Sequence, residues 1–185
     1  MSDSAWDRTL ILLALLAPLA MFALSKWRAS LETWYVPLDA DTAAHFGPAF
    51  EDKVAQWLAE DGASGARLVV IVDPACPCTT ATLSRLADAR AQSTRPDASL
   101  EVRHANGNDI SQAWATVLAE IPATPTLLAV EDGRLLYAGP VTAGNFCTTA
   151  VSRVLGLSVL ETPAASPLRN WLDRGCYCPL FGAVP

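Results

Sequence analysis

A run of seven residues at Arg67–Asp73, RLVVIVD, constrains the fold of this chain more than any other feature. The run is apolar, continuous and rich in β-branched residues, which is the pattern of a strand buried on both faces of a sheet. A turn with two prolines and two cysteines, Pro74–Cys78, follows directly. From Thr79 to about Ala91 the apolar residues then recur at helical spacing. The sequence therefore predicts a central strand, a cysteine turn and a helix that opens within that turn.

The rest of the chain predicts strands and helices that alternate around this unit. We expect an amphipathic helix over Phe50–Leu58 that ends near Gly62, a strand at Ser99–His104, a helix capped by Asp109 or Ser111 that runs to Leu118, a hairpin of Thr126–Val130 and Leu135–Ala138 around Asp132-Gly133, a helix near Asn145–Leu155, a linker at Ser158–Ser166, and a short helix that begins at Ser166-Pro167 and stops at Gly175. This order predicts an α/β fold in which helices cover both faces of a mixed sheet.

An apolar run near the N-terminus predicts a membrane anchor. Residues Thr9–Leu24, TLILLALLAPLAMFAL, are unbroken by charge and lie between Trp6 and Trp27. A cleaved signal peptide is the alternative, because Ala23-Leu24-Ser25 is a tolerable cleavage site, but tryptophans at both flanks favour a segment that stays in the membrane. The flanking positive charges nearly balance and do not settle orientation. Export of the following domain is favoured because disulfide chemistry persists outside the cytosol, so we expect that domain in the periplasm.

The domain organisation follows from these patterns. We expect an anchor or signal at residues 1–30, a connector and N-terminal helix at 31–66, a folded core at 67–156, and a linker, short helix and cysteine-containing tail at 157–185. The formal net charge is −6, and no run of Lys or Arg follows Arg28. Because nucleic-acid binding depends on cations that neutralise phosphates, the sequence argues against a nucleic-acid partner.

Two motifs give the chain a resemblance to the thioredoxin-like superfamily over roughly Arg67 to Leu155. They are the cysteine motif at the start of the first core helix and Thr124-Pro125 directly before the third strand. The stretches DPACPC, IPATPTLL and YAGPVTAGNFC, with the terminal CYC, also resemble an uncharacterised family of bacterial membrane-anchored thioredoxin-like proteins with a CPC motif. The resemblance implies a thioredoxin-like fold with an N-terminal transmembrane helix, a single-pass protein of the bacterial inner membrane.

The resemblance also implies a place for substrate. In thioredoxin-like proteins the proline equivalent to Pro125 is cis and lies against the cysteine turn, and the backbone before it pairs with an extended substrate. On this basis Thr124, Pro125 and the intervening Pro77 of the cysteine turn are assigned to substrate contact. Without the resemblance, Thr-Pro indicates only an extended dipeptide, since a residue before proline is disfavoured in helical conformation.

The turn Cys76-Pro77-Cys78 is the expected reactive centre. If the helix begins at Pro77, Cys76 takes the cap position and Cys78 the first turn, where free backbone N–H groups and the helix dipole stabilise a thiolate. Thioredoxins have two residues between their cysteines, whereas only one lies here. A direct bridge would close a small, strained ring and be easily reduced.

Three further cysteines offer partners for this turn. Cys147 is a candidate resolving cysteine, because the chain should return towards the turn after the hairpin; a buried core cysteine is the alternative. Cys176 and Cys178 repeat the one-residue spacing in the tail. They are either a solvated or locally bridged tail, or a second redox or metal pair that folds over Cys76 and Cys78.

Two main functions remain open. The first is a thiol-disulfide oxidoreductase that acts on protein thiols or disulfides without a cofactor, with Cys76, Cys78 and Cys147 as catalytic residues. The second is a copper(I) metallochaperone with Cys76, Cys78 and His104 as ligands, although a lone His at a strand end is more often structural. Zinc is disfavoured by the cysteine spacing. Both methionines lie within the first 21 residues, which weakens the copper hypothesis. An inactive interaction module is a third possibility.

Overall fold

The computed structural model describes residues 13–25, 33–34, 48–107, 110–141, 154–170, 174–175 and 177–180. The chain divides into two compact units, Met1–Glu32 and Thr33–Pro185. Within the first unit, residues 13–25 are helical and expose their large apolar side chains. No helix in the described ranges has both the length and the hydropathy needed to cross a membrane.

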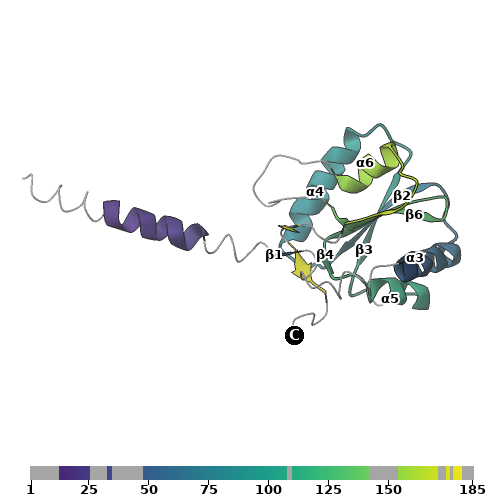
Figure 1. The fold of residues 1–185 in the computed structure, drawn as a ribbon, viewed down its shortest axis with the longest axis horizontal. Helices are drawn as coiled ribbons and strands as arrows, with labels where there is room; N and C mark the ends of the chain where they lie inside the picture. Colours follow the sequence, from purple (N-terminus) through teal and green to yellow (C-terminus); the bar gives the residue numbers. More distant parts are fainter. Residues whose placement is uncertain are drawn as a thin grey trace, which may run out of the picture. The chain divides into compact units, whose positions relative to one another are not determined.

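Among the described residues of the second unit, five strands form the main sheet in the order β3-β2-β5-β6-β7 (Figure 1). The central strand β2 (Ala66–Val72) pairs parallel with β3 (Ser99–His104) and antiparallel with β5 (Thr126–Glu131). β5 pairs antiparallel with β6 (Arg134–Pro140), and β6 pairs parallel with the short edge strand β7 (Leu168–Arg169). All seven residues of β2 are buried. The predicted mixed sheet with a doubly buried central strand is confirmed.

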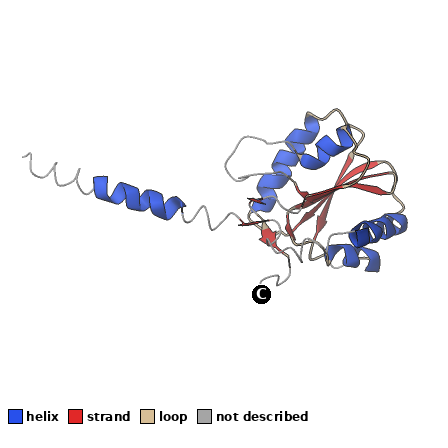
Figure 2. Ribbon diagram, viewed as in Figure 1, coloured by secondary structure: helices blue, strands red, loops and turns tan. Residues whose placement is uncertain are grey.

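Helices cover both faces of this sheet (Figure 2). α3 (Pro48–Asp61) and α5 (Gln112–Leu118) share one buried cluster, in which the rings of Trp57 and Trp114 lie 4.6 Å apart between centroids. α4 (Cys78–Ala91) and α6 (Leu155–Glu161) contribute to the cluster on the other face. The two-layer covering of the sheet is therefore as the element order predicts.

Local signals explain where several elements end. Gly62 has φ +67 directly after α3 and donates its N–H to the carbonyl of Leu58, a helix end that favours glycine. Ser111 caps α5 by accepting a hydrogen bond from the N–H of Trp114. Asp132 (φ 48) and Gly133 (φ 76) both have left-handed backbone, as a tight two-residue hairpin between β5 and β6 requires. These three predictions are confirmed.

Most of the helix expected near Asn145–Leu155 lies outside the described ranges, and α6 follows it in the chain. α6 begins at Leu155, where the predicted helix was to end, and it includes residues 158–161 of the predicted linker. Residues 142–153 lie outside the described ranges. The small and polar residues of this stretch indicated a linker, but Leu157 and Leu160 pack on the sheet and hold the segment in a helix. The linker prediction is therefore wrong for its first four residues.

The short helix predicted from Pro167 to Gly175 is also wrong. Leu168–Arg169 forms β7 against the edge of β6, and the N–H of Asn170 donates to the carbonyl of Ala138 at 2.8 Å. Arg174–Gly175 forms β8, which pairs antiparallel with β1 (Thr33–Trp34). Ser-Pro is a weak local helix signal, and pairing with an available strand edge outweighs it.

A polar cluster closes one side of the core. The Arg67 side chain is 8 % exposed; its Nη1 donates to Asp61 Oδ2 at 2.6 Å, and Arg103 Nη2 donates to Asp61 Oδ1 at 2.9 Å. The Arg103 guanidinium lies 5.0 Å and 4.8 Å from the ring centroids of Trp57 and Trp114. Burial by itself raises the pKa of Asp61, but the hydrogen bonds and charges of both arginines outweigh it, so the pKa lies below the ordinary value.

The tight approach of α6 to the sheet gives a first prediction. A Cβ at Gly156 would lie 2.5 Å from Cδ2 of Leu127, a fully buried side chain in β5. We expect Gly156→Ala to lower the free energy of unfolding by about 1–3 kcal/mol in a denaturant titration, because overpacking displaces the neighbouring core. Gly107→Ala, where the nearest heavy atom would be 3.4 Å away, is the matched control and should change stability little. An equally stable Gly156→Ala chain would contradict the close packing of α6.

The polar cluster gives a second prediction. Asp61→Asn leaves the buried Arg67 without its closest carboxylate and should cost about 1–2 kcal/mol at neutral pH, less than a fully buried pair because Asp61 itself is partly exposed. Because the folded-state pKa is lowered, the carboxylate stabilises the fold above about pH 4 and loses this effect as the pH falls through the folded pKa. The difference between the two chains should therefore shrink in acid. Asp97→Asn, at an exposed pair with Arg95, is the control.

Candidate functional site

The cysteine turn and the Thr124-Pro125 peptide meet at one end of the sheet. Val72, the last residue of β2, pairs with His104, the last residue of the parallel strand β3. Ile71 pairs with Thr126, the first residue of the antiparallel strand β5. The turn that follows β2 and the dipeptide that precedes β5 are therefore neighbours. The Thr124-Pro125 peptide bond is cis, as the sequence resemblance implied.

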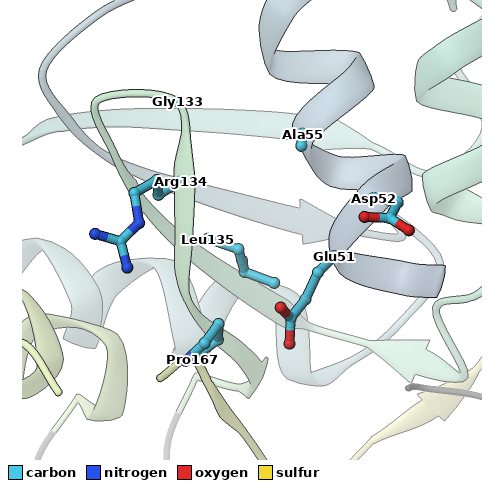
Figure 3. A pocket seen from close by; sticks show the side chains of 7 residues that line it. All are labelled: Glu51, Asp52, Ala55, Gly133, Arg134, Leu135 and Pro167. Atoms are coloured by element: carbon cyan, nitrogen blue, oxygen red, sulfur yellow. The ribbon is translucent and has the colours of Figure 1, made fainter. Parts of the chain in front are cut away.

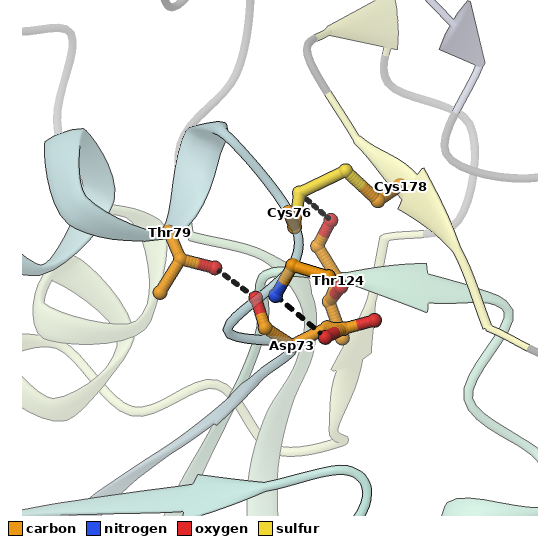
Figure 4. The surroundings of a disulfide bond; sticks show 6 residues. Asp73, Cys76, Thr79, Thr124 and Cys178 are labelled. Atoms are coloured by element: carbon orange, nitrogen blue, oxygen red, sulfur yellow. Dashed lines mark hydrogen bonds between the residues drawn. A yellow bond between two sulfur atoms is a disulfide. The ribbon is translucent and has the colours of Figure 1, made fainter.

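Asp73 organises the turn through three hydrogen bonds. Its carboxylate Oδ1 accepts a hydrogen bond from the N–H of Ala75 at 2.9 Å, and its carbonyl accepts from the N–H of Cys76 at 3.0 Å and from Oγ1 of Thr79 at 2.7 Å (Figure 4). α4 begins at Cys78 with Pro77 at the cap, one residue later than expected. Cys76 thus precedes the cap, and its carbonyl accepts from the N–H of Thr79 at 3.1 Å.

Cys76 forms a disulfide with Cys178 of the tail. The two sulfur atoms are 2.10 Å apart and the two Cα atoms 5.8 Å apart, although 102 positions separate the residues in the sequence. Cys78 is disulfide-bonded as well, with a partner that the described residues do not include. The structure therefore identifies Cys178 as the disulfide partner of Cys76. From the sequence, Cys78, Cys147 and the tail cysteines were all candidates for this partner. Cys147 and Cys176 lie outside the described ranges.

A short strand of the tail runs along the residues before Pro125. β9 (Cys178–Pro179) pairs antiparallel with β4 (Ala123–Thr124), so that Cys178 lies opposite Thr124. The next residue, Leu180, donates its N–H to the carbonyl of Pro122 at 3.0 Å. In Figure 1 this tail strand is drawn in yellow beside β4. Local sequence gave no signal for this pairing, because strands of two residues have no readable periodicity.

Two apolar tail side chains pack into the protein beside the disulfide. Tyr177 is 8 % and Leu180 is 5 % exposed, and both belong to the cluster that α3 and α5 build. Pro179, between Cys178 and Leu180, is exposed. The tail is therefore held by a disulfide, by backbone pairing and by two buried side chains.

Both cysteines of the turn are buried. Cys76 and Cys78 are 4 % and 2 % exposed, although Pro77 between them is exposed. The sulfur of Cys76 lies 3.7 Å from the carbonyl oxygen of Thr124. A thiol at Cys76 can donate a hydrogen bond to this oxygen, whereas a disulfide sulfur has no proton to donate. The hydroxyl of Thr124 is buried and has no hydrogen-bond partner in the part of the chain that the structure describes.

His104 is exposed at the end of β3. Among the described residues, no three His, Cys, Asp or Glu side chains come close enough together to hold a metal ion. The proposed copper set of Cys76, Cys78 and His104 therefore rests on the sequence alone. In the disulfide form, moreover, the two cysteines are not the thiolates that soft metals prefer.

A surface hollow of about 250 Å³ lies away from the cysteines (Figure 3). It is formed where the first turn of α3 meets the β5–β6 hairpin, at the end of the sheet opposite Pro125. Acidic and basic side chains face it together, and Arg169 Nη1 lies 3.3 Å from Glu51 Oε1 nearby. The lining residues are Glu51, Asp52, Ala55, Gly133, Arg134, Leu135 and Pro167. None of the predicted site residues is among them.

Fold and site together define a mixed α/β protein in which a CPC turn after the central strand is disulfide-linked to the C-terminal tail. The chain belongs to the family described as "Domain of unknown function (DUF6436)", whose model matches residues 48–180. That range includes the cysteine turn, the cis-proline and Cys178. Neither the curated proteins nor the solved structures contain a match to the chain.

The disulfide assignment can be checked by peptide mapping. In a Cys78→Ser/Cys176→Ser chain, tryptic digestion without reductant should yield the peptide Leu68–Arg85 linked to Gly175–Pro185. Adding Cys178→Ser should abolish this linked pair in the mass spectrum. A link from Leu68–Arg85 to the peptide that contains Cys147 would instead show that the tail is not the partner of Cys76.

Proposed function

We propose that the protein is a membrane-anchored periplasmic thiol-disulfide oxidoreductase of the thioredoxin-like type, which acts on protein thiols or disulfides through its CPC turn. The observation that carries this proposal is the disulfide between Cys76 and Cys178, formed beside a cis-proline. Cys178 reaches Cys76 on a strand that pairs with the residue before that proline. In a thioredoxin-like protein this is where the cysteine of an extended substrate reacts.

The fold supports the proposal. β2, α4, β3, α5, β5 and β6 follow one another in the order that a thioredoxin-like core requires, with β3 parallel and β5 antiparallel to β2. The cysteine turn lies at the start of the first core helix, and the cis-proline comes directly before the third core strand. Both motifs on which the sequence resemblance rests thus meet at one end of the sheet.

The chemistry is an exchange of disulfide partners. In the reducing direction, the Cys76 thiolate attacks one sulfur of a substrate disulfide; a bond forms between Cys76 and that sulfur, and the second substrate sulfur leaves as a thiolate. The Cys178 thiolate then attacks the Cys76 sulfur and displaces the first substrate sulfur. The substrate gains two electrons and, from solvent, two protons, while Cys76 and Cys178 are oxidised to a disulfide. The reverse sequence oxidises a substrate dithiol.

The start of α4 assists both directions. Cys76 lies next to the helix N-terminus, where unpaired backbone N–H groups and the helix dipole favour a negative charge. Stabilising the thiolate raises the fraction of Cys76 that is ionised and ready to attack. It also makes the Cys76 sulfur a better leaving group. Since all electrons move between sulfur atoms, the reaction needs no cofactor. A protein that cycles through disulfides is suited to an oxidising compartment, which supports the periplasmic location.

A redox titration of the full-length chain in mild detergent tests the proposal. The chain is equilibrated in graded glutathione buffers, trapped by alkylation and mapped by mass spectrometry. We expect a reversible two-electron couple that includes Cys76 at a potential within the range of the compartment. A copper(I) competition is run in parallel. Thiols that stay reduced throughout and bind copper(I) tightly would reject the oxidoreductase and favour the metallochaperone.

Substitution of the proposed nucleophile gives a kinetic test. Cys76→Ser should lower the rate of disulfide exchange with a model protein disulfide by about two orders of magnitude or more, because a hydroxyl cannot replace the thiolate. Ser84→Ala, at an exposed position of α4, is the matched control and should retain the wild-type rate. Full exchange activity in the Cys76→Ser chain would refute the mechanism.

A further inference from the structure

We infer that the surface under the tail selects extended polypeptides by the side chains on either side of their cysteine: a large apolar residue directly before it and an apolar residue two positions after it. We call this surface the tail site and define it by Pro122, Ala123, Thr124 and Cys76. The inference rests on the proposed function and adds the class of substrate that this function acts on.

The tail site first recognises backbone. β9 pairs antiparallel with β4, and the N–H of Leu180 donates to the carbonyl of Pro122 at 3.0 Å. Such pairing needs an extended chain whose own N–H and C=O groups are free, which a residue inside a helix or a central strand does not offer. The occupant is therefore an unfolded segment, an exposed loop or a terminus.

The tail site then recognises three of the four side chains presented by the segment Tyr177–Leu180. Tyr177 and Leu180 are almost fully buried in the cluster that includes Ile121 and Ala123. Cys178 is bonded to Cys76 (Figure 4), whereas Pro179 is exposed. Burial of large apolar side chains favours binding, and an exposed position leaves the residue free to vary. The tail site thus recognises a segment of four residues: an aromatic residue, a cysteine, any residue and an aliphatic residue.

The tail and a substrate exclude each other. Both need the free backbone edge of β4 and the same sulfur of Cys76. A substrate therefore enters only after the bond between Cys76 and Cys178 has been broken by a dithiol reductant or by the substrate's own thiolate. When the tail returns, Cys178 bonds to Cys76 and displaces the substrate sulfur. The tail therefore occupies the site in the absence of substrate and also supplies the cysteine that resolves the mixed disulfide.

Rates of mixed-disulfide formation with short peptides test the inference. In the full-length chain, four substitutions leave Cys76 as the single cysteine: Cys78→Ser, Cys147→Ser, Cys176→Ser and Cys178→Ser. It reacts with blocked tetrapeptides whose cysteine has an aromatic thiol as a coloured leaving group. Attack by Cys76 forms its bond to the peptide sulfur and releases the aromatic thiolate. Tyr-Cys-Pro-Leu is compared with Ala-Cys-Pro-Leu, Tyr-Cys-Pro-Ala and Tyr-Cys-Ala-Leu. Each rate is divided by the rate with glutathione whose cysteine carries the same aromatic thiol.

We expect each loss of an apolar side chain to slow the reaction by about tenfold, since a large apolar side chain is removed from a buried position. Tyr-Cys-Ala-Leu should react within about threefold of the parent peptide, because the position it changes corresponds to the exposed Pro179. N-methylation of the leucine removes the N–H that meets the Pro122 carbonyl and should slow the reaction by about fivefold. The tail, still present in this chain, competes with all peptides equally and leaves their ratios unchanged.

The outcomes separate this inference from the proposed function. Equal rates for all peptides would overturn the substrate class while leaving disulfide exchange at Cys76 intact. A chain whose Cys76 thiol is alkylated readily but forms no mixed disulfide with any peptide would overturn the proposed function itself.

A second measurement uses the wild-type chain and does not depend on multiple substitutions. Re-formation of the bond between Cys76 and Cys178 is followed in a glutathione buffer after reduction. The thiol-free peptide Tyr-Ser-Pro-Leu should slow this step by occupying the tail site, and Ala-Ser-Pro-Ala should not. Identical effects of the two peptides would reject the recognition of the flanking side chains.

Discussion

Backbone pairing on both sides of β2 is the constraint on which the rest of this structure depends. All seven residues of the strand are buried, so their N–H and C=O groups must be satisfied by β3 on one side and β5 on the other. This pairing fixes the register between the end of β2 and the start of β5. It thereby brings the cysteine turn against the cis-proline and leaves the backbone edge of β4 open to one further strand.

The tail completes that edge and connects distant parts of the chain. Its strand β9 pairs with β4, and β8, a few residues earlier, pairs with β1 near the start of the second unit. The disulfide between Cys76 and Cys178 closes a loop of 102 positions. Loop-closure entropy for a loop of about 100 residues corresponds to roughly 4–5 kcal/mol of stabilisation. Reduction at the proposed reactive cysteine therefore also loosens the C-terminal segment, so redox state and access to the site are coupled.

Much of the core was predictable because it is encoded in local patterns. The continuous apolar run of β2, the Ser111 cap and the Asp132-Gly133 turn each specify an element through residues that are close in sequence. The end of the chain was predicted poorly for the opposite reason. The stretch Pro167–Gly175 has weak local preferences. Leu168–Arg169 and Arg174–Gly175 form strands within it because the edges of β6 and β1 are available for pairing.

In the candidate site, too, some features are encoded locally and others depend on tertiary structure. The residue types of a reactive cysteine turn, and the proline that faces it, are readable from a few adjacent positions, since helix-start chemistry and proline geometry act over one or two residues. Which cysteine meets Cys76 is a different kind of property. Cys178 is selected by a two-residue strand pairing and two buried side chains, Tyr177 and Leu180, that contact residues far away in the sequence. Only the folded sheet creates the edge on which that pairing forms, so only the tertiary structure decides it.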